Sequence, residues 1–257
     1  MSNAFIAKNI DVFYNKKQIV KNVNFTMYPK ELNALLGRNG CGKTSLLKGI
    51  LGLVKADGTI LLDNELITSL GVKDKAKKIS YIAQRSDITY AISVKDLIYM
   101  GLNPHLSLFE SIDKKHECRV VEVAKELGLE SFLDKDYLAL SEGQKQLVII
   151  ARAIIQDTSV LLLDEPDSAM DFVVRHTILG NIKELITHHN KMALITMHDP
   201  NFALAYCDNI FLMRDGALLE TIRMQYDEPI EIQRKLRLIY GEIDVIEHKG
   251  KYYMVHA

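Results

Sequence analysis

Hydrophobic and polar residues alternate along the first part of the chain, as they do in a strand with one buried face. The alternation runs from Phe5 to Tyr14 and resumes over Val23–Met27, after a turn predicted at Asn15–Lys17. Pro29 cannot donate a backbone hydrogen bond, so the second strand is expected to end before it. The N-terminal part of the chain therefore predicts antiparallel strands.

A second pattern consists of short runs in which nearly every residue is apolar, which is typical of strands buried on both faces. Such strands are expected at 32–36, 79–84, 160–163, 192–197 and 209–213, with a further strand at 58–63. Segments with helical spacing lie between them, at 45–51, 141–153 and 172–188. Strands that alternate with helices predict an α/β protein with a mostly parallel sheet.

Residues 93–137 interrupt this alternation, because they carry helical signals and no strand signal. We expect a helical insertion there, within a single domain whose core is 1–92 and 138–225. Asp215-Gly216 predicts a tight hairpin turn. Short alternating stretches at 244–247 and 252–255 predict a small hairpin in a C-terminal appendage, 226–257.

One segment between a strand and a helix has a specific chemistry. It reads Gly37-Arg38-Asn39-Gly40-Cys41-Gly42-Lys43-Thr44, the pattern G-x-x-x-x-G-K-[ST] of a phosphate-binding loop. The glycines allow a tight turn whose N–H groups face an anion, and the helix N-terminus adds partial positive charge. Lys43 can reach the β- and γ-phosphates, and Thr44 can hold Mg²⁺. A chance glycine-rich turn is the alternative, which the flanking strand and helix disfavour.

Composition narrows the class of protein. The chain has 257 residues, 48% of them hydrophobic, and a net charge of −1 with acids and bases mixed, which gives no reason to expect a nucleic-acid partner. We see no signal peptide and no apolar run of about 18 residues, the length that a membrane helix needs. The three scattered cysteines predict neither a disulfide framework nor a metal site. A soluble protein of a reducing compartment is expected.

Acidic residues follow the buried strand at 160–163. The carboxyl ends of parallel strands are where ligands bind in α/β folds. Of Asp164 and Glu165, one could hold Mg²⁺ and the other could act on an attacking water. The pair could also be only a helix-start signal, but together with the phosphate loop it favours the metal site. His198 follows the strand at 192–197 on the same side and could reach a γ-phosphate.

Other positions remain open when each is considered alone. Gln84 ends an apolar strand at its ligand side, yet it could be an ordinary surface residue. Ser141 and Gln144 form the S-x-x-Q pattern of a helix capping box. Tyr14 could be an ordinary strand aromatic.

Taken in order, these motifs resemble those of the ATPase subunit of an ABC transporter. They lie at residues 37–44, 84, 140–144, 160–166 and 198, so the resemblance covers nearly the whole chain. The resemblance implies a phosphate-loop NTPase core with a mostly parallel sheet, an N-terminal antiparallel β-subdomain and a helical insertion subdomain. It also implies ATP and Mg²⁺ as cofactors and ATP hydrolysis as the activity.

The resemblance also assigns roles to residues. Tyr14 would stack on adenine, Glu165 would be the catalytic base, and Lys43, Gln84 and His198 would assist it. Thr44, Gln84 and Asp164 would hold Mg²⁺. The nucleotide would contact Tyr14, Gly37, Arg38, Asn39, Gly40, Cys41, Gly42, Lys43, Thr44, Ser45, Ser141, Gly143 and Gln144.

Leu140–Gln144 matches the family signature L-S-G-G-Q, which contacts ATP held by a second copy, so an ATP-dependent homodimer is implied. Residues 168–171 match the family's D-loop. The implied partners are two membrane-spanning permease subunits and, indirectly, an extracytoplasmic substrate-binding protein, with no nucleic acid. The chain would be a peripheral subunit at the cytoplasmic face of the membrane.

A narrower resemblance concerns the cargo. Residues 99–105 look like the L-G-R-x-P-H stretch of iron-siderophore, haem and cobalamin importers, although Leu102 replaces the arginine. Residues 151–158 and Tyr240-Gly241 also resemble that group. Import of an iron complex is expected, with a zinc or manganese importer as the alternative.

Two further alternatives lie outside transport. A soluble ABC ATPase of DNA repair or translation would carry long heptad repeats or a second cassette, and the sequence contains neither. A non-hydrolysing ATP-gated module would lack Glu165 or Lys43, and both are present.

Two residues depart from the family pattern, and a third, Cys41, has an expected reactivity. Glu142 replaces a signature glycine and Asp167 replaces a threonine, and each adds a carboxylate where phosphate would bind. We expect Glu142 to point away from the phosphate. Cys41 lies near a helix N-terminus, where a thiol pKa tends to fall, so we expect it to be reactive.

Overall fold

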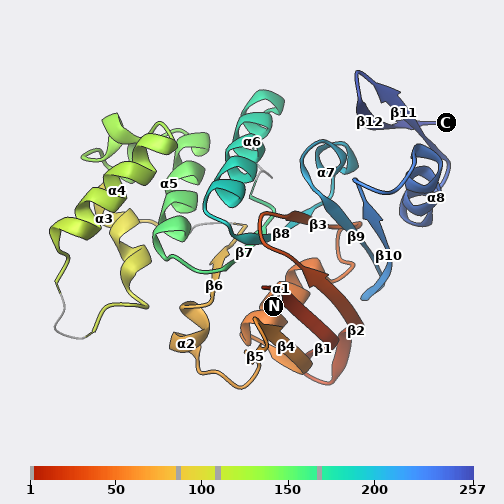
Figure 1. Ribbon diagram of the computed structural model, residues 1–257, viewed down its shortest axis with the longest axis horizontal. Coiled ribbons are helices and arrows are strands. Elements are labelled where there is room, and N and C mark those ends of the chain that lie inside the picture. Colours follow the sequence, from red (N-terminus) through yellow and green to blue (C-terminus); the bar gives the residue numbers. More distant parts are fainter. Residues whose placement is uncertain (1–2, 85–87, 108–110, 167–169) are drawn as a thin grey trace.

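The computed structural model describes residues 3–84, 88–107, 111–166 and 170–257 (Figure 1). Within these ranges the strands form a four-stranded antiparallel sheet, a six-stranded mostly parallel sheet and a C-terminal hairpin. The four-stranded sheet has the order β2-β1-β4-β5, with β1 Phe5–Tyr14, β2 Lys17–Met27, β4 Lys55–Leu62 and β5 Glu65–Leu66. The predicted antiparallel N-terminal strands are confirmed, and β2 begins earlier than the sequence pattern indicated.

The six-stranded sheet has the order β10-β9-β3-β8-β7-β6. Its strands are β3 Leu32–Leu36, β6 Ile79–Ile82, β7 Val160–Asp164, β8 Met192–Met197, β9 Asn209–Arg214 and β10 Ala217–Arg223. All neighbours pair in parallel except β9 and β10, which form a hairpin. Asp215 and Gly216 both have positive φ, as a tight two-residue hairpin turn requires.

Alternate residues of these strands enter two different cores. In β7, Leu161 and Leu163 pack with the helices on one face, whereas Val160 and Leu162 pack with the antiparallel sheet and α1 on the other. Both faces are covered, and this explains why the strands are apolar without alternation.

The helices of the described residues are α1 Lys43–Leu51, α2 Val72–Ala76, α3 Val94–Tyr99, α4 Lys114–Glu126, α5 Glu142–Ile155, α6 Phe172–His188, α7 Pro200–Tyr206 and α8 Pro229–Tyr240, with 3-10 turns at Met100–Leu102, Glu130–Phe132 and Tyr137–Ala139. Figure 1 shows α3, α4 and α5 gathered at the left of the view, with α6 between them and the C-terminal elements α7 and α8. Helices α3 and α4 pack on α5, so the helical insertion predicted within 93–137 is confirmed as a helical region. Its exact limits stay a prediction. No helix of the described residues combines the length and apolar character of a membrane span.

The C-terminal region holds more structure than the sequence pattern predicted. The hairpin is present as β11 Ile243–His248 and β12 Lys251–His256, but it is preceded by the unpredicted helix α8. This helix buries Ile232, Leu236 and Ile239, which are four and three residues apart and therefore lie on one face.

Candidate nucleotide site

The predicted site residues converge at the carboxyl edge of the six-stranded sheet. The order β3-β8-β7-β6 places the ends of these strands side by side. Leu36, at the end of β3, pairs with Met197 of β8, and Asp164, at the end of β7, pairs with Thr196 of β8. The loop at 37–42, the carboxylates and His198 therefore follow neighbouring strands.

The glycines of the loop are required by its backbone. Gly40 and Gly42 have φ of 78° and 111°, a region that side chains disfavour. A Cβ on Gly37 would lie 2.3 Å from the carbonyl oxygen of Met213. Substitution at any of these glycines would therefore distort the loop.

Lys43, the first residue of α1, is held inside the loop. Its ammonium donates to the carbonyl oxygens of Gly37 at 2.8 Å and Arg38 at 3.4 Å. Its Nζ also lies 3.8 Å from Oε1 of Glu165, and the side chain is only 5% exposed. A buried cation held by weak carbonyl acceptors is prepared to bind an anion.

Asp164 is the centre of a buried hydrogen-bond network. Its Oδ1 accepts from Thr44 Oγ1 at 2.9 Å and from Thr196 Oγ1 at 2.8 Å, and Oδ2 accepts from the Tyr81 hydroxyl at 3.3 Å. Burial and the Asp164 carboxylate raise the pKa of Tyr81, so this phenol remains a donor. Thr196 and Tyr81 were not predicted as site residues, because no sequence motif contains them.

Glu165 is held in a rare conformation. Its φ is 45°, in the left-handed region. The Thr196 hydroxyl accepts the Glu165 N–H at 2.9 Å, and Gln84 Nε2 donates to Glu165 Oε2 at 2.9 Å. Gln84 lies just beyond β6 rather than within the strand as expected. Backbone strain at a carboxylate is common at functional sites.

The oxygen atoms of this edge suit a hard divalent cation. Thr44 and Asp164 already contact each other, and Gln84 lies within reach of the neighbouring Glu165 carboxylate. Hydroxyl, carboxylate and amide oxygens, with phosphates and water, are the ligands that Mg²⁺ takes at nucleotide sites. The residues present therefore fit this ion.

Other predicted residues lie at the periphery of the edge. Tyr14 ends β1 with its side chain exposed, and Arg38 and Asn39 are exposed at the loop tip. His198 is exposed directly after β8. Ser45 lies half-buried in the first turn of α1.

Ser141 and Gln144 bond to each other rather than to the phosphate loop. The predicted capping box is confirmed, because Gln144 N–H donates to Ser141 Oγ at 3.4 Å and Ser141 N–H donates to Gln144 Oε1 at 3.0 Å. Gly143 lies against Val174 of α6. Glu142 pairs with Lys145 at 2.8 Å, and its side chain is 70% exposed.

The expected lowering of the Cys41 thiol pKa is wrong. The side chain is 7% exposed, and burial raises the pKa of the thiol, outweighing the opposite effect of the Lys43 charge. The sequence placed Cys41 near a helix N-terminus but could not show that the loop covers it.

Of the predicted D-loop, residues 168 and 169 lie outside the described residues, as does Asp167, and Asp171 caps α6.

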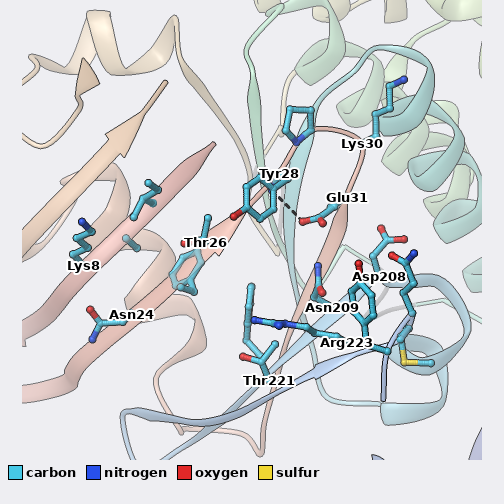
Figure 2. A pocket seen from close by; sticks show the side chains of 18 of the residues that line it. Lys8, Asn24, Thr26, Tyr28, Lys30, Glu31, Asp208, Asn209, Thr221 and Arg223 are labelled. Atoms are coloured by element: carbon cyan, nitrogen blue, oxygen red, sulfur yellow. Dashed lines mark hydrogen bonds between the residues drawn. The ribbon is translucent and has the colours of Figure 1, made fainter. Parts of the chain in front are cut away.

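A large groove lies elsewhere. Figure 2 shows it between the two sheets, lined by Lys8 and Asn24 of the antiparallel sheet and by Asn209 and Arg223 of the other. Asn209 begins β9, which runs parallel to β3, so the groove lies at the opposite edge from the phosphate loop. The groove is therefore separate from the phosphate loop and from the predicted site residues around it.

A phosphate loop, a paired lysine and a strand-end acid pair define a nucleotide-binding ATPase of the phosphate-loop class. A family model described as ABC transporter matches residues 20–168, more than half of the chain. The chain belongs to the ABC transporter family and is an ATP-binding subunit with ATPase activity.

Curated relatives agree with this assignment. The chain is 34% identical over 248 residues to the "Probable iron chelatin transport ATP-binding protein" of Helicobacter pylori, covering 95% of this chain and 96% of the relative. It is 31% identical to the petrobactin import ATP-binding protein FpuD of Bacillus anthracis, covering 84% and 79%. It is also 33% identical to the manganese transport system ATP-binding protein MntB of Halalkalibacterium halodurans, covering 80% of each.

Solved structures share the fold. CbiO1 of Clostridium perfringens, part of the ABC transporter complex cbiONQ, superposes with a TM-score of 0.79 at 27% identity, covering 93% and 96%. The ADP conformation of MJ1267, an ATP-binding cassette of an ABC transporter, gives a TM-score of 0.81 at 22% identity, covering 94% and 100%. The predicted fold class is confirmed.

Proposed function

We propose that this chain energises import of an iron chelate, working as a homodimer on two permease subunits at the cytoplasmic face of the membrane. The observation that carries the ATPase part is the buried Asp164 network beside Lys43 and Glu165. The names of the iron chelatin and petrobactin relatives support the cargo.

ATP binding begins at the phosphate loop. Lys43 would exchange its bonds to the Gly37 and Arg38 carbonyls for the β- and γ-phosphate oxygens, which are stronger acceptors. Tyr14 would stack on adenine from the end of β1. Thr44, Asp164 and Gln84 would hold Mg²⁺, which when bound neutralises charge on the phosphates.

Hydrolysis requires a water in line with the γ-phosphate. Glu165 would orient and polarise this water, and Gln84 holds the Glu165 carboxylate at 2.9 Å. His198 and Lys43 would stabilise charge on the transferring group. The hydrogen bond that the Glu165 N–H donates to the Thr196 hydroxyl would hold the Glu165 backbone in its left-handed conformation, so the base would be positioned before ATP arrives.

The signature helix supports a shared site. Ser141 caps α5, and its side chain is exposed, as is that of Glu142. A helix N-terminus with free N–H groups is suited to an anion from another molecule. A second copy would bring its own γ-phosphate to this surface, and each ATP would then lie between two chains.

The cargo is tested by transport in cells that lack this chain but keep its permease. Uptake of a radiolabelled iron chelate is expected to return with the wild-type chain and not with Glu165→Gln, while Mn²⁺ uptake does not respond. Restored Mn²⁺ uptake with no effect on iron would favour the manganese alternative, which the MntB relative suggests.

A further inference from the structure

The C-terminal region contacts the segment that carries His198 at two points. The Tyr240 hydroxyl, at the end of α8, donates to the carbonyl oxygen of His198 at 3.1 Å. Asn201 bonds to the backbone of Met254 in β12, accepting from its N–H at 2.7 Å and donating to its C=O at 3.2 Å. Two residues of this segment, His198 and Asn201, are thus attached to residues 42 and 53 positions further along the chain.

The end of α8 is itself held firmly. Leu236 and Ile239 are buried in the main core, and Tyr240 packs against it. Arg214, at the end of β9, donates to the Leu238 carbonyl at 2.6 Å, and Arg237 donates to the Ile243 carbonyl at 2.8 Å. The position of the Tyr240 hydroxyl is therefore determined by packing, and not by its contact with His198 alone.

His198 lies in the short connection between a strand and a helix and belongs to neither element. A contact from outside these elements can therefore help to fix its backbone. His198 follows Met197, the last residue of β8, and precedes Asp199, the N-cap of α7. A bond to the His198 carbonyl fixes the following peptide plane and, with it, the backbone from which the imidazole projects. Burial, followed by the nearby Asp199 charge, raises the pKa of Tyr240, so the phenol remains a donor.

We propose that Tyr240 is a positioning residue that holds His198 in the direction needed for ATP hydrolysis. This inference rests on the proposed role of His198. The Tyr240 hydroxyl bonds to the His198 carbonyl, so Tyr240 would act through the main chain of His198. Because His198 would act mainly in the transition state, loss of the hydroxyl should lower kcat and leave the KM for ATP nearly unchanged.

The first test compares Tyr240→Phe with the wild-type full-length chain in steady-state hydrolysis of Mg·ATP. We expect kcat to fall, by up to about the 100-fold that a 1 Å misplacement can cost, while KM changes little. Tyr226→Phe is the matched control, because that phenol is 73% exposed on the surface, and it should behave as wild type. An unchanged kcat in Tyr240→Phe would overturn the proposal.

A double-mutant cycle separates positioning from general loss of structure. In the His198→Ala background, Tyr240→Phe should have no further effect on kcat, because the group that it positions is gone. Fully additive effects would contradict the proposal. Asn201→Ala removes the second contact, and it should lower kcat in the wild-type background but not in the His198→Ala background. This variant replaces Tyr240→Phe in the cycle if Tyr240→Phe folds poorly.

A different experimental result would contradict the proposed function itself. If Glu165→Gln hydrolyses ATP as fast as wild type, or if His198→Ala does, the catalytic assignment is wrong. If both variants are impaired and Tyr240→Phe is not, only the positioning role is excluded.

Discussion

At the scale of single residues, the site depends on buried polar groups that satisfy one another. Asp164 is 2% exposed and accepts from three hydroxyls, two of which belong to residues outside every motif, Tyr81 and Thr196. Thr196 also fixes the Glu165 backbone. The chemistry of the motifs is therefore supported by neighbours that only the strand register brings close.

We expect Glu165→Gln to keep ATP binding and to lose hydrolysis. The amide preserves the size of the side chain but cannot polarise water as a base, while Lys43 and the loop remain intact. ATP would then stay trapped and the dimer would persist in size-exclusion chromatography with Mg·ATP, whereas wild type dimerises transiently. A monomer that demonstrably binds nucleotide would contradict the shared-site mechanism.

Cys41 should react slowly with maleimide at neutral pH. Its thiol is buried and its pKa is raised, so the reactive thiolate is scarce. Labelling followed by mass spectrometry should find the exposed Cys118 modified first. Cys118→Ala should remove the fast phase and Cys41→Ala should not. Fast labelling of Cys41 in the folded chain would show that the loop opens.

At the scale of elements, helix ends determine how the site is built. The N-terminus of α1 follows the phosphate loop, and that of α5 is capped by Ser141. The first turn of α5 carries Glu142, whose charge interacts favourably with the helix dipole and with Lys145. This helix end is the one proposed to meet the phosphate of a second copy.

Glu142→Gln should strengthen ATP-driven dimerisation modestly. Removing an exposed charge of the same sign as the phosphate is worth about 0.3–1 kcal/mol, roughly two- to fivefold in the dimerisation constant. The gain should shrink as salt rises. Sedimentation in the Glu165→Gln background at two salt concentrations measures it.

The matched control is Glu117→Gln, because Glu117 is also an exposed first-turn glutamate, on α4. It should leave dimerisation unchanged. A gain of tenfold or more from Glu142→Gln that survives high salt would show that Glu142 faces the phosphate directly.

At the scale of the whole molecule, the six-stranded sheet holds two cores together. Leu162 and Leu163 are adjacent in sequence and fully buried, yet they belong to different clusters on opposite faces. The strand that delivers Asp164 and Glu165 therefore depends on packing against both the antiparallel sheet and the helices.

Leu162→Ala should lower the free energy of unfolding by about 2–5 kcal/mol, because it removes buried methyl groups and leaves a cavity. Thermal unfolding followed by circular dichroism measures the change. Leu53→Ala is the control, since Leu53 is 58% exposed and should change stability by less than about 0.5 kcal/mol. Equal losses in the two variants would contradict the two-core description.

The sequence alone determined the class of this protein, because the phosphate loop, the strand-end acids and the capping box are local patterns whose chemistry depends on neighbours in the chain. It also predicted the buried strands, since burial on both faces requires continuous apolar runs. Helix α8 was missed although Ile232, Leu236 and Ile239 follow helical spacing, because the region was interpreted only as a hairpin.

Tertiary structure decided the rest. It placed Thr196 and Tyr81 on Asp164, covered Cys41 and so reversed the expected pKa shift, and attached Tyr240 to His198. Each of these contacts joins residues far apart in the chain or depends on what covers a side chain. Local periodicity gives neither the order of strands in a sheet nor the burial of a single side chain. These contacts are therefore seen only in the folded molecule.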